Sequence, residues 1–164
     1  MLRPLHIALL LAVAAVLGGC DRYLAREVRI DATHAKVYAT AGADVTFRVI
    51  NRGDRPLRFD GAELRLIYEG GEVLRATLRD TVAAAPRRES EVRTRWRLRI
   101  PDRAALYAVG RKLQHAETQG MTVALALRVC VDGRMKKYDR RMPLSDFLNT
   151  FGLRPEDLLT DFEE

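Results

Sequence analysis

Hydrophobic and polar residues alternate along several stretches of this 164-residue chain, as they do in β-strands with one buried face. Between residues 45 and 49, apolar side chains alternate with Thr46 and Arg48. The clearest such stretch covers residues 92–100, where the odd positions are all arginine: Arg93, Arg95, Arg97 and Arg99. No helix places four consecutive odd positions on one side, so this stretch predicts a strand with one buried and one solvent-exposed face.

Turn-forming residues separate the predicted strands. Gly70-Gly71 stands between two apolar runs, and Asp132-Gly133 follows an alternating stretch over residues 123–131. Both pairs predict tight hairpins, because the central residues of such turns adopt positive φ. The residues that follow, 134–140, are polar and basic, which predicts an edge strand.

Two segments have helical spacing instead. Pro101 ends the arginine-rich strand, Asp102 is placed to cap a helix, and apolar residues then recur up to Gln114 at Leu106, Val109 and Leu113. Pro143 precedes a second such series, which Gly152 ends: Leu144, Phe147, Leu148 and Phe151.

Short strands joined by hairpins, with one helix between strands, predict a mainly β fold. The pattern is typical of an antiparallel β-sandwich of immunoglobulin or fibronectin-III kind, which we assign to residues 28–141. Residues 142–164 are expected to add a C-terminal helical segment with an acidic tail. The length suits one modest domain.

The first twenty residues predict export and lipid attachment. Residues 7–17 are apolar and uncharged, a run of signal-peptide length that falls short of the roughly 20 residues a membrane span needs. Leu17-Gly18-Gly19-Cys20 then resembles the lipobox of bacterial lipoproteins. This resemblance implies a signal peptide over 1–19, a diacylated Cys20 that holds the protein to a membrane facing the periplasm, and a tether over 20–27. The alternative is an ordinary secretory signal with an incidental cysteine. Which of the two membranes is involved stays open.

The charge of the chain is basic but unevenly distributed. Lys and Arg number 28 against 22 Asp and Glu, a formal charge of +6. Five acids and no base occur in the last ten residues, whereas residues 20–154 carry 27 bases and 17 acids, or +10. In an exported protein this excess favours anionic lipid head groups or an envelope polyanion as neighbours, and it excludes nucleic acid as the expected partner.

Several motifs between residues 28 and 100 resemble those of one known family. The strand over 45–50 runs into Asn51, and a short turn leads to Pro56-Leu57, Phe59 and Gly61 to Leu64. The Gly70-Gly71 hairpin and a strand after Pro86-Arg87-Arg88 follow. These features resemble the water-stress-and-hypersensitive-response domain of type 2 late embryogenesis abundant proteins. The resemblance implies a small fibronectin-III-like sandwich without catalytic residues, with stress protection and membrane or protein association as its expected roles.

The residues offer little for catalysis or metal binding. Ser90, Ser145, His34 and His115 are in no nucleophile-elbow motif and have no recognisable orienting partner. An enzyme would require a cleft that gathers Glu63, His34 and Ser90. After the predicted signal peptide, the two histidines and the free Cys130 are far apart and match no metal-ligand spacing, so we expect no enzyme, no metal and no cofactor. Cys130 stands in an apolar run, which predicts a buried, inert thiol.

The row Arg93, Arg95, Arg97 and Arg99 is the candidate binding surface. It is either a solvated strand face paired with acids such as Glu63 and Glu69, or a cationic face for lipid phosphates or an anionic partner. We therefore expect a non-enzymatic, lipid-anchored binding or structural module of the bacterial cell envelope. The alternative is a periplasmic accessory or chaperone-like adaptor that recruits a protein partner along an open strand edge.

Overall fold

The computed structural model describes residues 27–38, 42–150 and 154–155. Within these ranges the chain forms eight strands and two helices: β1 (Val28–Tyr38), β2 (Gly42–Asn51), β3 (Leu57–Tyr68), β4 (Gly71–Leu78), β5 (Val82–Ala84), β6 (Arg88–Arg99), α3 (Arg103–Gln114), β7 (Met121–Val131), β8 (Arg134–Pro143) and α4 (Leu144–Thr150). The predicted signal peptide, Cys20, the tether up to residue 26, Phe151 and the acidic residues after 155 lie outside the described residues.

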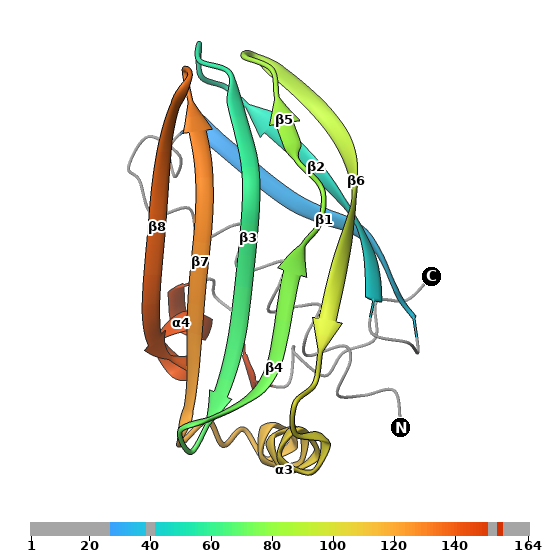
Figure 1. Ribbon diagram of the computed structural model, residues 1–164, viewed down its shortest axis with the longest axis vertical. Helices are drawn as coiled ribbons and strands as arrows, with labels where there is room; N and C mark the ends of the chain where they lie inside the picture. The colour runs from blue at the N-terminus through green and yellow to red at the C-terminus, as the bar shows by residue number, and fades with distance from the viewer. Residues whose placement is uncertain (1–26, 39–41, 151–153, 156–164) are drawn as a thin grey trace.

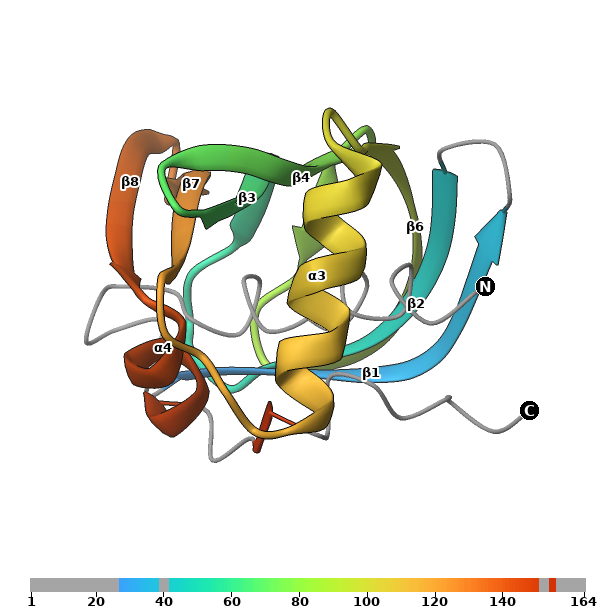
Figure 2. The ribbon, with the colours of Figure 1, turned by 90° about the horizontal axis from the view of Figure 1, so that it is seen from below.

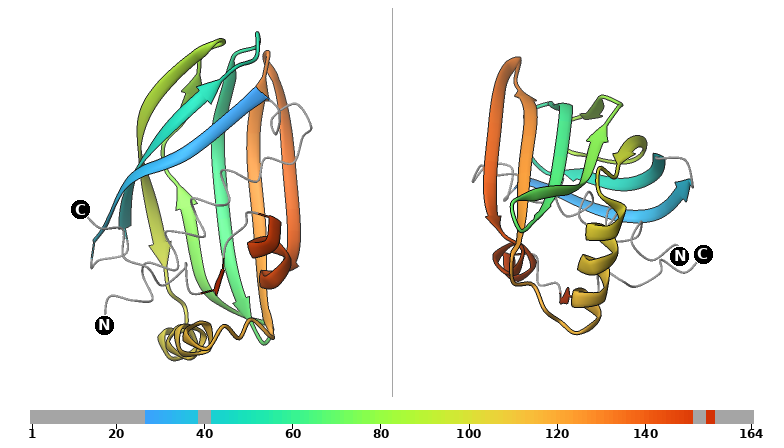
Figure 3. Two further views of the ribbon diagram at one scale, coloured as in Figure 1. Left: turned by 180° about the vertical axis from the view of Figure 1, so that it is seen from behind. Right: turned by 60° about the horizontal axis from the view of Figure 1, so that its bottom comes forward.

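The strands form one antiparallel sheet in the order β1-β2-β6-β4-β3-β7-β8, and β5 pairs separately with β3. The sheet curls strongly, so that β1 crosses behind β7 and β3 (Figures 1 and 3). Four residue pairs between β4 and β6, from Arg75↔Arg99 to Leu78↔Trp96, join strands β1, β2 and β6 to strands β4, β3, β7 and β8 in one continuous sheet. The prediction of a mainly β, antiparallel fold is confirmed.

The inner side of the curled sheet holds the core. Alternate residues of β2, β3, β6 and β7 point inward, as in β6, where Thr94, Trp96 and Leu98 are buried and the residues between them are exposed. The alternation read from residues 92–100 is thus confirmed. A sheet curled in this way encloses much of its own apolar face, and the two helices cover further parts of it.

The two predicted helices are both present. Helix α3 lies across one end of the curled sheet (Figure 2) and buries Leu106, Val109 and Leu113 there. Its N-cap is Asp102, as expected, with the carboxylate accepting the Ala105 N–H at 2.9 Å. Helix α4 packs against β7 and β8 through the side chains of Leu144, Phe147 and Leu148, all buried. No helix within the described ranges is long and apolar enough to cross a membrane.

One hairpin matches its prediction and the other is shifted by a residue. Asp132 and Gly133 adopt φ of 52° and 76°, forming the expected two-residue turn. In the other hairpin the left-handed residues are Glu69 and Gly70, with φ of 50° and 83°, and Gly71 is already the first residue of β4. The shift accompanies a register change in the β3–β4 ladder: Leu66 pairs with Leu74, but Ile67 pairs with Glu72 and Tyr68 with Gly71, which leaves Glu69 and Gly70 as the turn.

Candidate functional site

The four arginines of β6 lie on the outer face of the sheet, as predicted. The side chains of Arg93 and Arg95 are 71% and 72% exposed, and those of Arg97 and Arg99 are exposed as well. Beneath them, the indole Nε1–H of Trp96 donates to the Thr94 hydroxyl at 2.9 Å, and that hydroxyl donates to the Val45 carbonyl at 2.8 Å. The polar groups on the buried face of β6, the Thr94 hydroxyl and the Trp96 indole N–H, therefore have hydrogen-bond partners. The arginines on the opposite face are held in place by this ordered strand.

Arg93 and Arg95 are paired within the molecule. Arg93 Nη2 donates to Asp44 Oδ2 at 2.6 Å on the neighbouring strand β2. Arg95 donates to Asp80 Oδ1 through Nη2 at 2.9 Å and Nε at 3.2 Å, and its backbone N–H reaches Oδ2 at 2.6 Å. These side-chain hydrogen bonds from Arg95 lower the pKa of Asp80. The expected partners Glu63 and Glu69 were wrong, because β6 lies between β2 and β4 and not beside β3.

Arg97 and Arg99 differ from their neighbours. Among the described residues, no carboxylate lies within 4 Å of either guanidinium. Arg99 pairs with Arg75, which pairs with Arg65. Arg65 pairs with Ala124, and Ala124 with Arg141. Paired residues share a face, so this register aligns arginines from four strands across the outer side. We call this set the arginine belt: Arg65, Arg75, Arg97, Arg99 and Arg141.

Acids neutralise part of the belt. Glu72 accepts from Arg75 at 2.9 and 2.7 Å, and this hydrogen-bonded contact lowers the pKa of Glu72. Glu63 lies 3.6 Å from Arg65 and 4.0 Å from Arg75. Among the described residues, the belt arginines with no carboxylate within 4 Å are Arg97 and Arg99 on β6 and Arg141 on β8. Sequence reasoning missed Arg65 and Arg75, although both alternate with apolar residues, because only the strand register shows that they continue the row.

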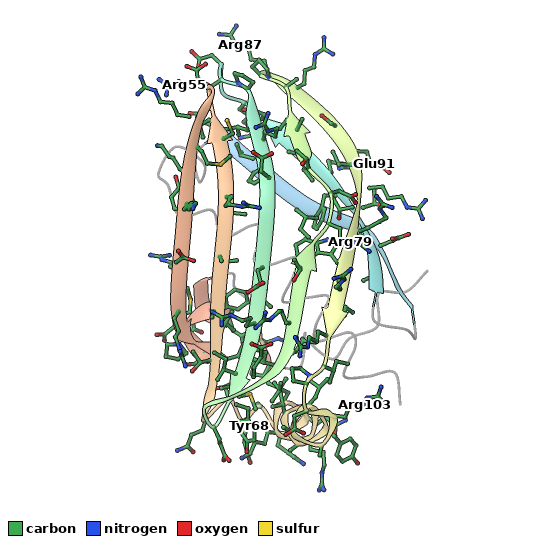
Figure 4. All side chains as sticks on the ribbon, viewed as in Figure 1. Arg55, Tyr68, Arg79, Arg87, Glu91 and Arg103 are labelled. Carbon is green, nitrogen blue, oxygen red and sulfur yellow. The ribbon has the colours of Figure 1, made fainter. Side chains whose placement is uncertain are left out.

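A second cationic surface lies at the end of the sheet opposite α3 (Figure 4). We call it the loop end, and it consists of residues 27–29, 51–56, 84–88 and 132–134. Backbone hydrogen bonds join these segments: Arg52 N–H donates to the Glu27 carbonyl at 2.7 Å, Arg87 N–H to the Gly53 carbonyl at 3.0 Å, and Asp132 N–H to the Pro56 carbonyl at 3.3 Å. Four stretches distant in sequence are therefore held as one surface.

Asn51 is the centre of the loop end. It is 1% exposed, donates from Nδ2 to the carbonyls of Arg55 at 2.9 Å and Ala84 at 3.2 Å, and accepts the Gly53 N–H at 3.0 Å. A buried amide with all these partners fixes the loop geometry. The exposed basic side chains around it come from every segment: Arg29, Arg52, Arg55, Arg87, Arg88 and Arg134. Sequence reasoning did not group them, because they are spread over about 100 positions.

Cys130 does not lie where it was expected. Its side chain is of intermediate exposure and faces outward, since the buried residues of β7 are its neighbours Val129 and Val131. It pairs in register with Arg58 on β3 and Met135 on β8. The prediction of a buried thiol is therefore wrong. The apolar run arose because the outer face of β7 also carries small residues, Ala124 and Ala126, which long neighbouring side chains partly cover.

The residues considered for catalysis whose side chains are described are not brought together. Glu63 shares a row with Arg97 through Thr77. Ser90 lies seven residues further along β6, which corresponds to roughly 23 Å. The side chain of His34 lies outside the described residues. His115 is the exposed C-cap of α3, and Ser145 is exposed on α4. Within the described residues, no group of three or more His, Cys, Asp or Glu side chains is arranged to hold a metal ion.

A small cavity lies inside the curled sheet. Its volume of about 10 Å³ has room for one water at most, and its lining is apolar apart from Thr94. The lining residues are Phe47, Val49, Phe59, Ala62, Leu78, Val82, Thr94, Trp96 and Leu127. This cavity is a gap in the core and not a ligand site.

Comparisons with known proteins give no family assignment. No family model matches the chain, and no curated protein matches it. A protein from Archaeoglobus fulgidus is similar to it in structure at 11% identity, covering 72% of this chain and 95% of its own, with a TM-score of 0.36. The GAE domain of yeast GGA1 is similar at 9% identity, covering 71% and 89%, with a TM-score of 0.37. Scores at this level carry no argument about function.

Proposed function

We propose that this protein is a non-enzymatic, lipid-anchored binding module of the bacterial cell envelope that uses the arginine belt to contact an anionic partner. The observation that carries the proposal is the exposure of Arg97 and Arg99 with no carboxylate within 4 Å among the described residues. Arginine suits such a contact because its planar fork binds phosphate or carboxylate oxygens in pairs. The resemblance to type 2 late embryogenesis abundant proteins adds stress protection to the proposed role.

The anchor in this proposal is Cys20, on the strength of the Leu17-Gly18-Gly19-Cys20 motif. Two or more acyl chains hold a small domain firmly, because each buried CH₂ contributes about 0.8 kcal/mol. Metabolic labelling with a clickable fatty acid tests the anchor. We expect labelled protein in the membrane fraction and loss of the label in Cys20→Ala. An equally labelled Cys20→Ala variant would exclude this cysteine as the acylated residue.

We also propose that the curled sheet is an opened form of the immunoglobulin-like sandwich. In this description β1, β2 and β6 make one layer, and β3, β7 and β8 make the other. The inward position of the core residues between the layers supports it. Such a scaffold presents rigid outer faces for binding, which is how many β-sandwich domains serve as contact modules.

In-cell photo-crosslinking tests the binding proposal. A photoreactive amino acid is placed at position 97 or 99, and the matched control carries it at position 93, whose arginine is paired with Asp44. We expect reproducible adducts of one chemical class from 97 and 99, and few from 93. The absence of adducts at both positions 97 and 99 would show that the belt is solvated surface and would overturn this part of the proposal.

The alternative function is that of a periplasmic adaptor that adds a partner's strand to an open sheet edge. Strand β8 is an edge strand of ten residues with mostly exposed side chains. However, five of the ten are basic: Arg134, Lys136, Lys137, Arg140 and Arg141. Such charges normally oppose edge pairing. A single protein adduct from β8 positions other than 141, with none from positions 97 and 99, would favour the adaptor.

A further inference from the structure

We propose that the loop end is the surface with which this protein meets the membrane, and that its arginines bind the phosphate groups of anionic phospholipids. The inference rests on the proposed envelope location and adds which side of the domain faces the bilayer. The arginine belt lies on the sheet's outer face and would then stay available to a partner in the periplasm.

The charge of the loop end supports this orientation. Its six exposed arginines are opposed by three acids, Glu27, Asp54 and Asp132. For four of the six, no carboxylate lies within 4 Å among the described residues: Arg52, Arg87, Arg88 and Arg134. Exposed arginines without internal partners are available for the phosphates of a lipid surface, and each contributes about a fivefold preference for an anionic membrane.

The position of the first described residues points the same way. Glu27 and Val28 belong to the loop end, because the Glu27 carbonyl accepts the Arg52 N–H and Val28 pairs with Asn51. A tether over residues 20–27 reaches at most about 28 Å when fully extended. A twelve-residue strand such as β3 is about 40 Å long. A domain anchored at Cys20 therefore cannot stand with its α3 end on the same bilayer.

The loop end is also preorganised for contact. Asn51 and the backbone hydrogen bonds described above hold the three loops and the start of β1 together. Arg87 adopts a φ of 54° in the turn that leads into β6. Because the backbone is already ordered, binding loses mainly side-chain freedom, which favours affinity.

The α3 end lacks these properties. Arg103, Arg111 and Lys112 are offset there by three acids: Glu69, Asp102 and Glu117. Lys112 pairs with Glu117 at 3.4 Å, and Asp102 is used as the N-cap. The exposed Tyr107 on this end provides a position for a control probe, since its side chain is 65% exposed.

The test uses the full chain, processed in a Gram-negative host, purified from membranes and reconstituted on vesicles. A fluorophore is attached at Ala85→Cys on the loop end or at Tyr107→Cys on the α3 end, each in a Cys130→Ser background. Head-group-linked quenchers in phosphatidylglycerol vesicles then report which probe lies at the bilayer surface. We expect strong quenching at position 85 and little at 107, with the difference reduced in phosphatidylcholine vesicles and by added salt.

Charge variants identify the arginines responsible. The triple variant Arg52→Gln, Arg88→Gln and Arg134→Gln is expected to lower the population of the loop-end-down orientation by at least about tenfold. Its matched control removes the same charge elsewhere: Arg79→Gln, Arg103→Gln and Arg111→Gln. Both triples change exposed side chains only. Circular dichroism and thermal unfolding verify that each remains folded.

The outcomes separate this inference from the anchor. A flotation assay reports whether the protein binds phosphatidylglycerol and phosphatidylcholine vesicles at all. Flotation with both vesicle types and quenching mainly at position 85 would support both the lipid anchor and the loop-end contact. Flotation with both types and equal quenching at the two positions would overturn the loop-end inference and leave the anchor standing. Flotation only with anionic vesicles, lost in the loop-end triple alone, would support the loop-end contact and overturn the anchor. Flotation with neither would overturn both.

Discussion

The two ends of the curled sheet are closed by different physical means. At one end α3 lies across the opening and buries Leu106, Val109 and Leu113, so closure depends on the hydrophobic effect. At the loop end Asn51 closes the sheet through hydrogen bonds to three backbone groups. The helix end is balanced in charge, and the loop end has an excess of arginine. Closure by polar contacts leaves the loop side chains pointing outward, which makes that end the better interaction surface.

The largest effect on this comparison is expected at the helix end. Leu113 is fully buried, so Leu113→Ala removes apolar contacts and leaves a cavity under α3. We expect the free energy of unfolding to fall by about 3 kcal/mol. The exposed Tyr107→Ala on the same helix is the control and should change it by less than about 0.5 kcal/mol. Urea unfolding measures both. Equal effects would show that α3 does not close the core.

The next effect tests closure of the loop end. Asn51→Ala leaves the Arg55 and Ala84 carbonyls and the Gly53 N–H without their partner in a buried site. We expect a loss of about 2 kcal/mol in the free energy of unfolding. Asn51→Asp keeps the acceptor for the Gly53 N–H but loses the two hydrogen bonds that Asn51 donates. Urea unfolding of both variants shows how much of the lost free energy of unfolding comes from the two donated bonds. A neutral Asn51→Ala would contradict the role given to this amide.

A smaller effect is expected at the start of α3. Asp102→Ala removes the carboxylate that accepts the Ala105 N–H. The helix cap contributes about 1 kcal/mol to stability, and Asp102→Ser should restore most of it. Thermal unfolding compares the three proteins. If Asp102→Ser is as unstable as Asp102→Ala, the cap is not the source of the effect.

The smallest effect concerns the paired arginines between the two ends. Arg95 lowers the pKa of Asp80, so the folded state favours the ionised carboxylate. A lowered folded pKa adds stability that is present above the unfolded value of about 3.9 and is lost as pH falls through the folded pKa. Because both groups are partly exposed, the contribution is small. Unfolding of wild type and Asp80→Asn should differ at pH 7 and converge in acid. A difference that persists in acid would exclude titration of Asp80 as its cause.

Local features of this protein were readable from the sequence. The alternation at residues 92–100 identified β6 and its dry face, and the Asp102 cap with apolar spacing to Leu113 identified α3. These depend on side chains a few residues apart, whose geometry follows from the period of a strand or a helix. The Asp132-Gly133 hairpin belongs to the same class.

Whatever depended on strand order and register was decided by the tertiary structure. Sequence reasoning paired the β6 arginines with the wrong acids, because it could not show that β2 and β4 flank β6. It predicted a buried Cys130, although the thiol is out of phase with Val129 and Val131 and faces outward. Asn51 and the loop-end arginines gather only when strands distant in sequence pair. Periodicity determines which side of a strand is buried, but long-range packing determines which strands meet.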